Sequence, residues 1–465
     1  MNLTFLGATQ TVTGSKFLLE NKDVRVLIDC GLFQGMKELR LRNWEGPPVD
    51  PASVDMIILT HAHIDHTGYL PRFVAQGFKG PVYATPATVD LARILLPDAG
   101  HLQEEEARYR NKHQLSKHKP ALPLYTVENA VAALELLQPV KYGQVVALSS
   151  TLAFELMPAG HILGSSFVRV REGGPSAEKT ALFTGDIGRY DQPIILDPTP
   201  VDAADYVVLE STYGNRLHSD KNGRSGKDQL REVVLSTAKR GGTILIPSFA
   251  IGRAQELLYI LRELEVENQI PVLPVYVDSP MAIDAFEIFR NHREEHDLEM
   301  TELEKAGGNP LYSKRVYFVR TVEDSKAINE HRFPSIIISA NGMATGGRIL
   351  HHLVQRLPDE RNSVIFVGFQ AAGTRGRLLS EGARQVRIFG VDYPVRAAIY
   401  VIDSFSAHGD YSEILRWLRG FKQAPRKTFL VHGEPKAAEA MKGHIQATFQ
   451  TWQVEVPTYL QSYEI

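Results

Sequence analysis

Short apolar runs alternate with bends that carry glycine, aspartate or histidine along most of the first 210 residues. Five of these runs have the pattern of buried strands: Val24–Asp29, Met56–Thr60, Leu152–Ala159, Ala181–Asp186 and Tyr206–Glu210. Polar or metal-capable residues stand where each run stops. Because functional side chains of layered α/β folds lie on loops at strand ends, the pattern predicts such a fold, with a site at those ends.

From about residue 243 to residue 376 the pattern changes to an apolar strand, a glycine-rich turn and a helix, three times over. The segments are TILIPSFAIGRAQELLYIL, IIISANGMATGGRILHHLV and SVIFVGFQAAGTRGRLLSEG. Such units predict a mainly parallel sheet flanked by helices. The first pattern then returns in AAIYVIDSFSAHGDYSEILRWL and KTFLVHGEPKAAEAMKGHI. We therefore predict one α/β domain, residues 1–208 and 389–465, interrupted by an inserted domain at residues 209–388.

Length and composition narrow the function classes. A chain of 465 residues is too long for one ordinary core, which agrees with two domains. The net charge of −3 gives no general affinity for polyanions, so any nucleic-acid contact must come from a local patch. A single cysteine, Cys30, cannot form an intramolecular disulfide, and we expect a buried, inert thiol. Without a signal peptide or an apolar run near the ~20 residues of a membrane span, the sequence predicts a cytoplasmic protein.

The segment LTHAHIDHTGY crowds His61, His63, Asp65 and His66 into six positions after an apolar run. On a strand these side chains would alternate between two faces, but in a bend that enters a helix they can converge on two adjacent points. Imidazoles with carboxylates are the ligands expected of Zn²⁺, with Mn²⁺ or Fe²⁺ as alternatives where carboxylates contribute more of the ligands. An exposed polar loop would need four metal-type residues to cluster by chance.

Two later strand ends add donors of the same kind, His161 in MPAGHILGS and Asp186 in FTGDIG. Alone, each would be an ordinary hydrogen-bonded loop residue. With the first cluster they complete a two-metal set, in which the two oxygens of Asp186 can bridge the ions.

These residues carry a resemblance to a known family. HAHIDH resembles the HxHxDH signature of the metallo-β-lactamase superfamily, and Asp29, His161 and Asp186 match its other motif positions in order. Five further segments resemble motifs of the β-CASP nuclease branch of this superfamily: LESTYG, SFSAHGD, LVHGEP, GMATGGR and GFQAAGTRGR. The likeness covers nearly the whole chain and is greatest to RNA-processing members, such as the pre-mRNA 3′-end-processing endonuclease and its short bacterial and archaeal relatives. It implies an αββα sandwich with an inserted β-CASP domain.

The resemblance also implies a role for each motif residue. It assigns one zinc to His61, His63 and His161, a second zinc to Asp65, His66 and His432, and a place between them to Asp186, with Asp29 in support. It further implies that Glu210 orients His408 as general acid, and Asp65 could accept a proton from the shared water. Histidine at position 432 resembles the RNA-directed members, since DNA-directed relatives commonly carry valine there.

The three turns of the inserted domain supply candidates for contact with RNA phosphates. Each turn places glycines and an arginine at or near a helix start, and helix N-termini attract phosphates. The glycines could equally serve only to permit tight turns. The candidates are Ser248, Arg253, Arg348, Thr374 and Arg377. Tyr213 and Phe249 could stack on bases, although core packing explains Phe249 equally well.

One further motif is set aside. His292, Glu295 and His296 in NHREEHD fit the HxxEH pattern of certain zinc peptidases, but the surrounding charges predict a solvated helix face.

Taken together, the sequence predicts a two-zinc endoribonuclease acting on single-stranded RNA. Because no appended RNA-binding module is evident, affinity is expected from the active-site cleft, a partner protein or a homodimer. One rival is a thioester or lactone hydrolase on the same scaffold, although such leaving groups need little help from an acid such as His408. A 5′–3′ exoribonuclease is a second rival. A noncatalytic RNA-binding subunit is a third, but every expected ligand is present.

Overall fold

The chain folds into two compact units. A computed structural model describes residues 1–114, 118–174, 177–218, 224–305, 311 and 313–465. The first unit comprises Met1–Gln192, Leu196–Leu217 and His408–Ile465, and the second comprises Pro193–Ile195 and His218–Ala407. The second unit therefore interrupts the first in sequence.

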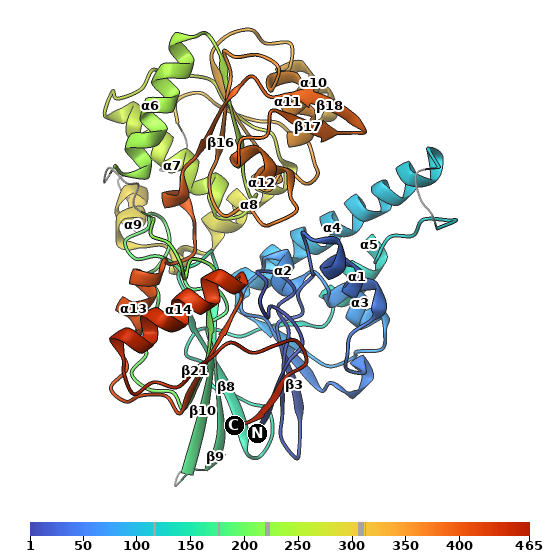
Figure 1. The fold of residues 1–465 in the computed structure, drawn as a ribbon, viewed down its shortest axis with the longest axis vertical. Helices are drawn as coiled ribbons and strands as arrows, with labels where there is room; N and C mark the ends of the chain where they lie inside the picture. Colours follow the sequence, from blue (N-terminus) through green and yellow to red (C-terminus); the bar gives the residue numbers. More distant parts are fainter. Residues whose placement is uncertain (115–117, 175–176, 219–223, 306–310, 312) are drawn as a thin grey trace. The chain divides into compact units, whose positions relative to one another are not determined.

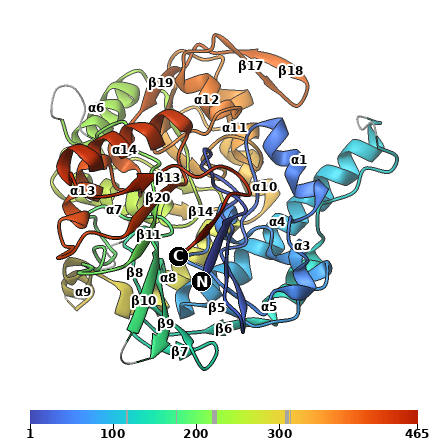
Figure 2. The same ribbon diagram turned by 60° about the horizontal axis from the view of Figure 1, so that its bottom comes forward.

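The first sheet of the first unit holds both ends of the chain. Its order is β22-β1-β2-β3-β4-β5-β6, antiparallel from β22 to β3 and parallel from β3 to β6. Since β1 pairs with β22, the two termini lie side by side, as Figures 1 and 2 show. The strands are β1 (Asn2–Phe5), β2 (Phe17–Glu20), β3 (Arg25–Ile28), β4 (Met56–Ile58), β5 (Val82–Ala84), β6 (Leu137–Pro139) and β22 (Ser462–Glu464).

The second sheet of this unit carries most of the strand ends that concern the site. Its order is β21-β20-β11-β10-β9-β8-β7, antiparallel from β7 to β10 and parallel from β10 to β21. The strands are β7 (Val146–Ala147), β8 (Leu152–Pro158), β9 (Ser166–Gly174), β10 (Ala177–Phe183), β11 (Tyr206–Glu210), β20 (Lys427–Val431) and β21 (Val454–Glu455). All five strands expected from the apolar runs are present, as β3, β4, β8, β10 and β11.

The two sheets pack face to face and helices cover their outer faces. Phe5 and Phe17 of the first sheet contact Phe429 and Phe183 of the second, with ring centroids 5.2 and 6.1 Å apart. Buried side chains of α3, α4 and α5 pack on the first sheet, and those of α13 and α14 pack on the second (Figure 1). The predicted αββα sandwich is thereby confirmed. The helices of this unit are α1 (Lys37–Glu45), η1 (Pro51–Ser53), α2 (Ile64–Thr67), α3 (Leu70–Ala75), α4 (Pro86–Lys112), α5 (Val127–Leu134), α13 (Tyr411–Leu418) and α14 (Pro435–Thr448).

The second unit is built on a parallel sheet, as predicted for the inserted domain. Its order is β14-β13-β15-β12-β16-β19, and every neighbouring pair is parallel. A separate hairpin pairs β17 with β18. The strands are β12 (Thr243–Pro247), β13 (Val275–Val277), β14 (Val316–Phe318), β15 (Ser335–Ser339), β16 (Ser363–Phe366), β17 (Gln385–Ile388), β18 (Val391–Pro394) and β19 (Ala398–Val401). The helices are α6 (Gly226–Lys239), α7 (Arg253–Val266), α8 (Pro280–Asn291), η2 (Arg293–Glu295), α9 (Leu298–Lys305), α10 (Val322–Ile328), α11 (Ile349–Arg356), α12 (Arg375–Ser380) and η3 (Asp403–Phe405).

The last strand of this sheet lies beyond the boundary predicted from the sequence. The sequence pattern places residues 389–465 with the first domain, but β19 pairs with β16 and the second unit extends to Ala407. An apolar run such as AAIYV has the same pattern whichever sheet it joins, so periodicity alone could not assign it.

The structure also bears on the single cysteine and on membrane-spanning helices. Cys30 is buried, and burial raises the pKa of its thiol to about 12, as expected of an inert cysteine. Within the described ranges, no helix combines the length and the apolar character needed to cross a membrane.

Candidate metal centre

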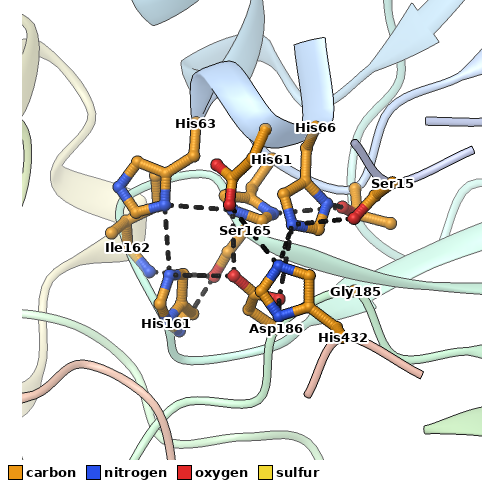
Figure 3. A network of polar contacts seen from close by, with 12 residues as sticks. Ser15, His61, His63, His66, His161, Ile162, Ser165, Gly185, Asp186 and His432 are labelled. Carbon is orange, nitrogen blue, oxygen red and sulfur yellow. Dashed lines mark hydrogen bonds and ion pairs between the residues drawn. The ribbon is translucent and has the colours of Figure 1, made fainter. Parts of the chain in front are cut away.

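Strand ends from both sheets of the first unit bring seven donor side chains together. Figure 3 labels all of them except Asp65. His61, His63, Asp65 and His66 follow β4, the last two within the short helix α2. The other three donors follow strands of the second sheet: His161 after β8, Asp186 after β10 and His432 after β20. The predicted ligands thus lie in one cluster, although they are spread over some four-fifths of the chain.

The first group of donors surrounds the Nδ1 atom of His63. This atom lies 3.1 Å from His61 Nε2 and 3.2 Å from His161 Nε2. Asp186 Oδ2 lies 3.5 Å from the same Nε2 atoms of His61 and His161. Four potential ligand atoms therefore converge on one point.

The second group surrounds the Nε2 atom of His432. This atom lies 3.3 Å from His66 Nε2 and 3.4 Å from Asp65 Oδ2. Asp186 Oδ1 lies 3.4 Å from His66 Nε2 and 3.4 Å from His432 Nδ1. Each oxygen of Asp186 therefore faces a different group, which is the arrangement required of a bridging carboxylate.

The spacing of these atoms fits metal ions. Around a tetrahedral zinc with Zn–N bonds of about 2.0–2.1 Å, two ligand atoms are separated by roughly 3.3 Å. The separations within both groups, 3.1–3.5 Å, match that value. Two imidazole nitrogens that face each other can share only one proton, so a cation between them relieves the repulsion of their lone pairs. Asp186 Oδ1 is also buried and has no hydrogen bond to any described residue. The donor set thus suits Zn²⁺, and Mn²⁺ less closely.

Burial and charge set the protonation of the histidines. Burial lowers the pKa of His61 well below 6.5 and lowers the pKa of His63 to about 4. These two imidazoles are therefore neutral, as a ligand must be. Burial also lowers the pKa of His66, but the carboxylates of Asp186 and Asp29 outweigh it and hold that pKa well above 6.5.

Asp29, for which the family resemblance implies a supporting role, contacts His66 and Thr60. Its Oδ2 atom lies 2.7 Å from His66 Nδ1 and accepts a 2.9 Å hydrogen bond from the Thr60 hydroxyl. Its Oδ1 atom accepts the backbone N–H of Thr60 at 2.8 Å. With Nδ1 of His66 held by Asp29, its Nε2 atom faces the second group. A carboxylate that orients a ligand imidazole in this way also increases its basicity.

Two threonines that sequence reasoning did not select orient one histidine in each group. The Thr60 hydroxyl, which donates to Asp29, lies 3.1 Å from His61 Nδ1. The Thr212 hydroxyl donates to the His432 carbonyl at 3.0 Å and lies 3.0 Å from His432 Nδ1. Since each hydroxyl proton is already committed, each oxygen accepts N–H from Nδ1, and Nε2 carries the lone pair toward the centre.

His432 stands in a constrained turn. Its φ of 48° lies in the left-handed region, which is costly for a residue with a side chain. Ser211 braces the same turn, since its hydroxyl donates to the Val431 carbonyl at 2.8 Å. The only signal in the sequence was the position of Ser211 and Thr212 directly after Glu210 in LESTYG.

Glu210 and His408 form a pair beside the two groups. Both carboxylate oxygens of Glu210 lie close to His408 Nδ1, at 3.1 and 3.2 Å, and Oε1 also accepts the backbone N–H of Ile187 at 2.7 Å. Burial lowers the pKa of His408, but Glu210 and then Asp186 outweigh it and raise it to about 9. The buried ring of Tyr213 stacks on His408 at 6.2 Å, so it packs behind this pair. The pair can hold and deliver a proton.

The five candidates for phosphate contact all lie in the second unit and are engaged with the protein itself. Arg348 donates to Asp278 Oδ1 at 2.7 Å and to the carbonyls of Val319 and Arg320. Arg253 is buried and paired with Glu256.

The remaining three candidates have local hydrogen bonds. Ser248 is buried and donates to the Phe249 carbonyl at 3.0 Å. Thr374 caps α12 by accepting the backbone N–H of Arg377. The Arg377 side chain pairs with Glu381 at 2.5 Å. These contacts give each of the three a structural role.

The HxxEH-like segment differs from the expectation in its environment. His292, Glu295 and His296 are buried rather than on a solvated helix face, because α8 ends at Asn291 and the chain turns inward. His296 Nε2 lies 2.8 Å from the Phe289 carbonyl. Among the described residues these three do not form a group that could hold a metal.

Comparison with known proteins gives three family matches along the chain. Residues 18–177 match the model of the metallo-beta-lactamase superfamily domain, residues 254–379 that of the Beta-Casp domain, and residues 392–457 that of the Zn-dependent metallo-hydrolase RNA specificity domain. Each of these descriptions agrees with the motifs that the sequence carries.

Similar proteins cover almost the whole chain. Ribonuclease TTHA0252 of Thermus thermophilus is 37% identical over 441 residues, 95% of each chain. Transcription termination factor FttA of Methanocaldococcus jannaschii is 30% identical over all of this chain and 72% of its own length. An RNase J-like protein of the same organism is 31% identical over 93% of this chain and 92% of its own. A crystal structure of a protein of unknown function from Enterococcus faecalis shares the fold, with a TM-score of 0.55 and 12% identity over 100% of this chain and 99% of the other.

Proposed function

The chain belongs to the β-CASP family of the metallo-β-lactamase superfamily, and from this premise we propose that it is a metal-dependent ribonuclease that cuts single-stranded RNA internally. One observation carries the proposal: two groups of largely buried ligand atoms both contact Asp186 and lie beside the Glu210–His408 pair. Two of its relatives are named as ribonuclease and RNase J-like protein, which supports RNA as the substrate class.

The ligand assignment follows the two groups. His61, His63 and His161 would hold one zinc, Asp65, His66 and His432 a second, and Asp186 would contact both. Bound there, a pair of divalent cations lowers the pKa of water and offsets the negative charge that grows on the phosphate oxygens. Mn²⁺ is the alternative because three oxygen atoms of Asp65 and Asp186 take part.

Two residues of this chain handle protons in the proposed reaction. Burial raises the pKa of Asp65, but the neighbouring imidazoles of His432 and His66 outweigh it and lower that pKa, so the carboxylate is ionised and can accept the proton of the attacking water. His408 donates a proton to the departing ribose oxygen, while Glu210 holds its Nδ1 side. An alkoxide leaving group needs this proton far more than a thiolate does, which favours a phosphodiester over a thioester substrate.

The test of metal dependence uses a labelled single-stranded RNA and the purified full chain. We expect cleavage to stop in EDTA and to return when Zn²⁺ or Mn²⁺ is added back after the chelator is removed. Metal analysis of the untreated protein should find about two ions per chain. Undiminished cleavage in EDTA would contradict the proposal, and so would faster turnover of acyl thioesters than of RNA.

A circular RNA separates internal cutting from trimming at a 5′ end. An endonuclease opens a circle because it needs no terminus, whereas a 5′–3′ exonuclease leaves it intact. We expect the circle to be opened at a rate close to that of its linear counterpart. Release of mononucleotides from the linear form, together with an uncut circle, would replace our proposal by the exonuclease. We place this activity in the cytoplasm on the strength of the sequence alone.

A further inference from the structure

A ladder of four aromatic rings runs along one edge of the second unit. Tyr317 of the edge strand β14 stacks on Tyr276 of β13, with centroids 5.3 Å apart and planes at 25°. Tyr276 contacts His331 at 5.6 Å, and its hydroxyl lies 3.2 Å from His331 Nδ1. His331 in turn stacks on Phe333, with centroids 5.0 Å apart and planes at 24°. Two stacked pairs are thereby joined into one ladder.

The ladder is anchored in the middle and exposed at both ends. Tyr276 is buried in the core of the second unit, whereas Tyr317 is 44% exposed and Phe333 is 42% exposed. Exposing the apolar surface of these two rings to water is unfavourable, so covering them would be favourable. Tyr317 and Phe333 therefore present aromatic surface to solvent, on which a further ring can pack.

Three cations flank the same rings. Lys314 and Arg315 immediately precede β14, and Arg332 stands between His331 and Phe333. All three residues are exposed. In the part of the chain that the structure describes, none of the three charged groups lies within ion-pair distance of a carboxylate. Two carboxylates stand near these cations: Glu265 Oε2 accepts the backbone N–H of Lys314 at 2.9 Å, and Glu330 directly precedes His331.

We propose that these rings and cations form a binding surface for single-stranded RNA, composed only of residues of the second unit. An exposed aromatic face stacks on any base, so it binds single strands without sequence preference. Lysine and arginine beside it neutralise the phosphates that follow each base. Three exposed cations, against two carboxylates beside them, favour a polyanion over an apolar protein segment as the occupant. The inference rests on the proposed function only in taking RNA as the nucleic acid.

The experiment measures binding of a fluorescein-labelled oligouridylate by anisotropy, with the full chain in EDTA so that the RNA is not cut. Replacing both end rings, by Tyr317→Ala with Phe333→Ala, should weaken binding by roughly 5-fold or more for each ring. The swaps Tyr317→Phe and Phe333→Tyr keep an aromatic face and should bind like the parent. Tyr109→Ala is the matched control, because Tyr109 is 48% exposed but lies in the first unit.

Salt dependence tests the cations separately. Lys314→Ala, Arg315→Ala and Arg332→Ala are measured as separate variants. In each, the slope of log affinity against log salt concentration should become less steep by about 0.7 for every phosphate that is no longer neutralised. The inference would be overturned if the Tyr317→Ala, Phe333→Ala double variant bound the oligouridylate as tightly as the parent and had the same thermal midpoint. The ladder would then be a candidate surface for binding protein. If the variants bind normally and the parent cuts RNA, this inference alone fails. If the parent binds RNA through the ladder but cuts none, the proposed function alone fails.

Discussion

Removal of the His408 imidazole should separate proton donation from metal binding. Its Nδ1 side is held by both oxygens of Glu210, at 3.1 and 3.2 Å, so a proton for transfer is carried on Nε2. His408→Ala therefore deletes the proposed acid and leaves the seven proposed ligands in place. Only 16% of the His408 side chain is exposed, so alanine leaves a small space at the centre rather than a change in the fold.

The expected loss follows from the role of the side chain. A positioned general acid contributes about 10²–10⁴-fold to a rate, which corresponds to roughly 3–5 kcal/mol of transition-state stabilisation. Glu210→Gln is the matched variant. Its amide oxygen can still accept the Nδ1 hydrogen bond, but it no longer favours the protonated ring, so we expect a smaller loss than in His408→Ala.

The assay compares two substrates at saturating metal. On labelled single-stranded RNA, His408→Ala should show the full loss, because a ribose oxygen must be protonated as it departs. On bis(p-nitrophenyl) phosphate it should keep most of its activity, because p-nitrophenolate leaves without a proton. Metal analysis should find the parent's metal content.

Two results would refute the reasoning. Equal losses on both substrates would mean that His408 acts on a step that the two reactions share, rather than on the leaving group. A fall in bound metal would make His408 a ligand, a role that its proximity to Asp186, Glu210 and His432 also permits.

Three further substitutions test the roles of Asp186, Thr212 and Arg348. Asp186→Asn should reduce metal content by more than one ion per chain, because the carboxylate faces both groups; loss of a single ion would argue against bridging. Thr212→Val should weaken metal binding by about 10–100-fold, measured by competition with a chelator. Thr212→Ser keeps the hydroxyl group and should bind metal as the parent does. Equal metal affinity of all three proteins would contradict the orienting role of Thr212. Arg348→Ala should lower the free energy of unfolding in urea by roughly 2 kcal/mol, because it removes the charged hydrogen bond of Arg348 to the buried Asp278, which keeps its contacts with His352 and Ser325. Reduced RNA affinity at unchanged stability would instead identify Arg348 as a phosphate contact.

The cluster of donor side chains could be predicted because its members follow strand ends. β10, β11 and β20 are parallel neighbours, so their carboxyl ends meet at one edge of the second sheet. Asp186 and His432 follow the first and the last of these strands, and Glu210 ends the middle one. Residues that are far apart in sequence therefore become neighbours through a pattern that can be read from the chain, an apolar run followed by a metal-capable residue.

The partners of individual side chains could not be predicted in this way. Arginine after a glycine-rich turn favours phosphate contact when only the sequence is considered. In the structure Arg348 instead pairs with Asp278, the residue after β13, which also lies 2.6 Å from His352. That pairing depends on which strands are adjacent in a parallel sheet, and local spacing carries no record of it. The same holds for Thr60 and Thr212. Their hydroxyl groups can orient His61 and His432 only because the fold places these histidines beside them.

Residues of the centre have left-handed backbone conformations, which cost free energy that side-chain hydrogen bonds must offset. Asp29 and His432 have φ values of 60° and 48°, and Gly185 beside Asp186 has 50°. Each follows a strand, where side chains would otherwise alternate between faces, so a left-handed residue serves to turn a donor toward the centre. For a residue with a side chain this conformation costs roughly 1–2 kcal/mol. The hydrogen bonds of Thr60 to Asp29 and of Thr212 to His432 hold two of these turns in place. Substitutions in this surrounding layer should therefore reduce metal affinity before they reduce the stability of the fold, since the core between the sheets does not depend on them.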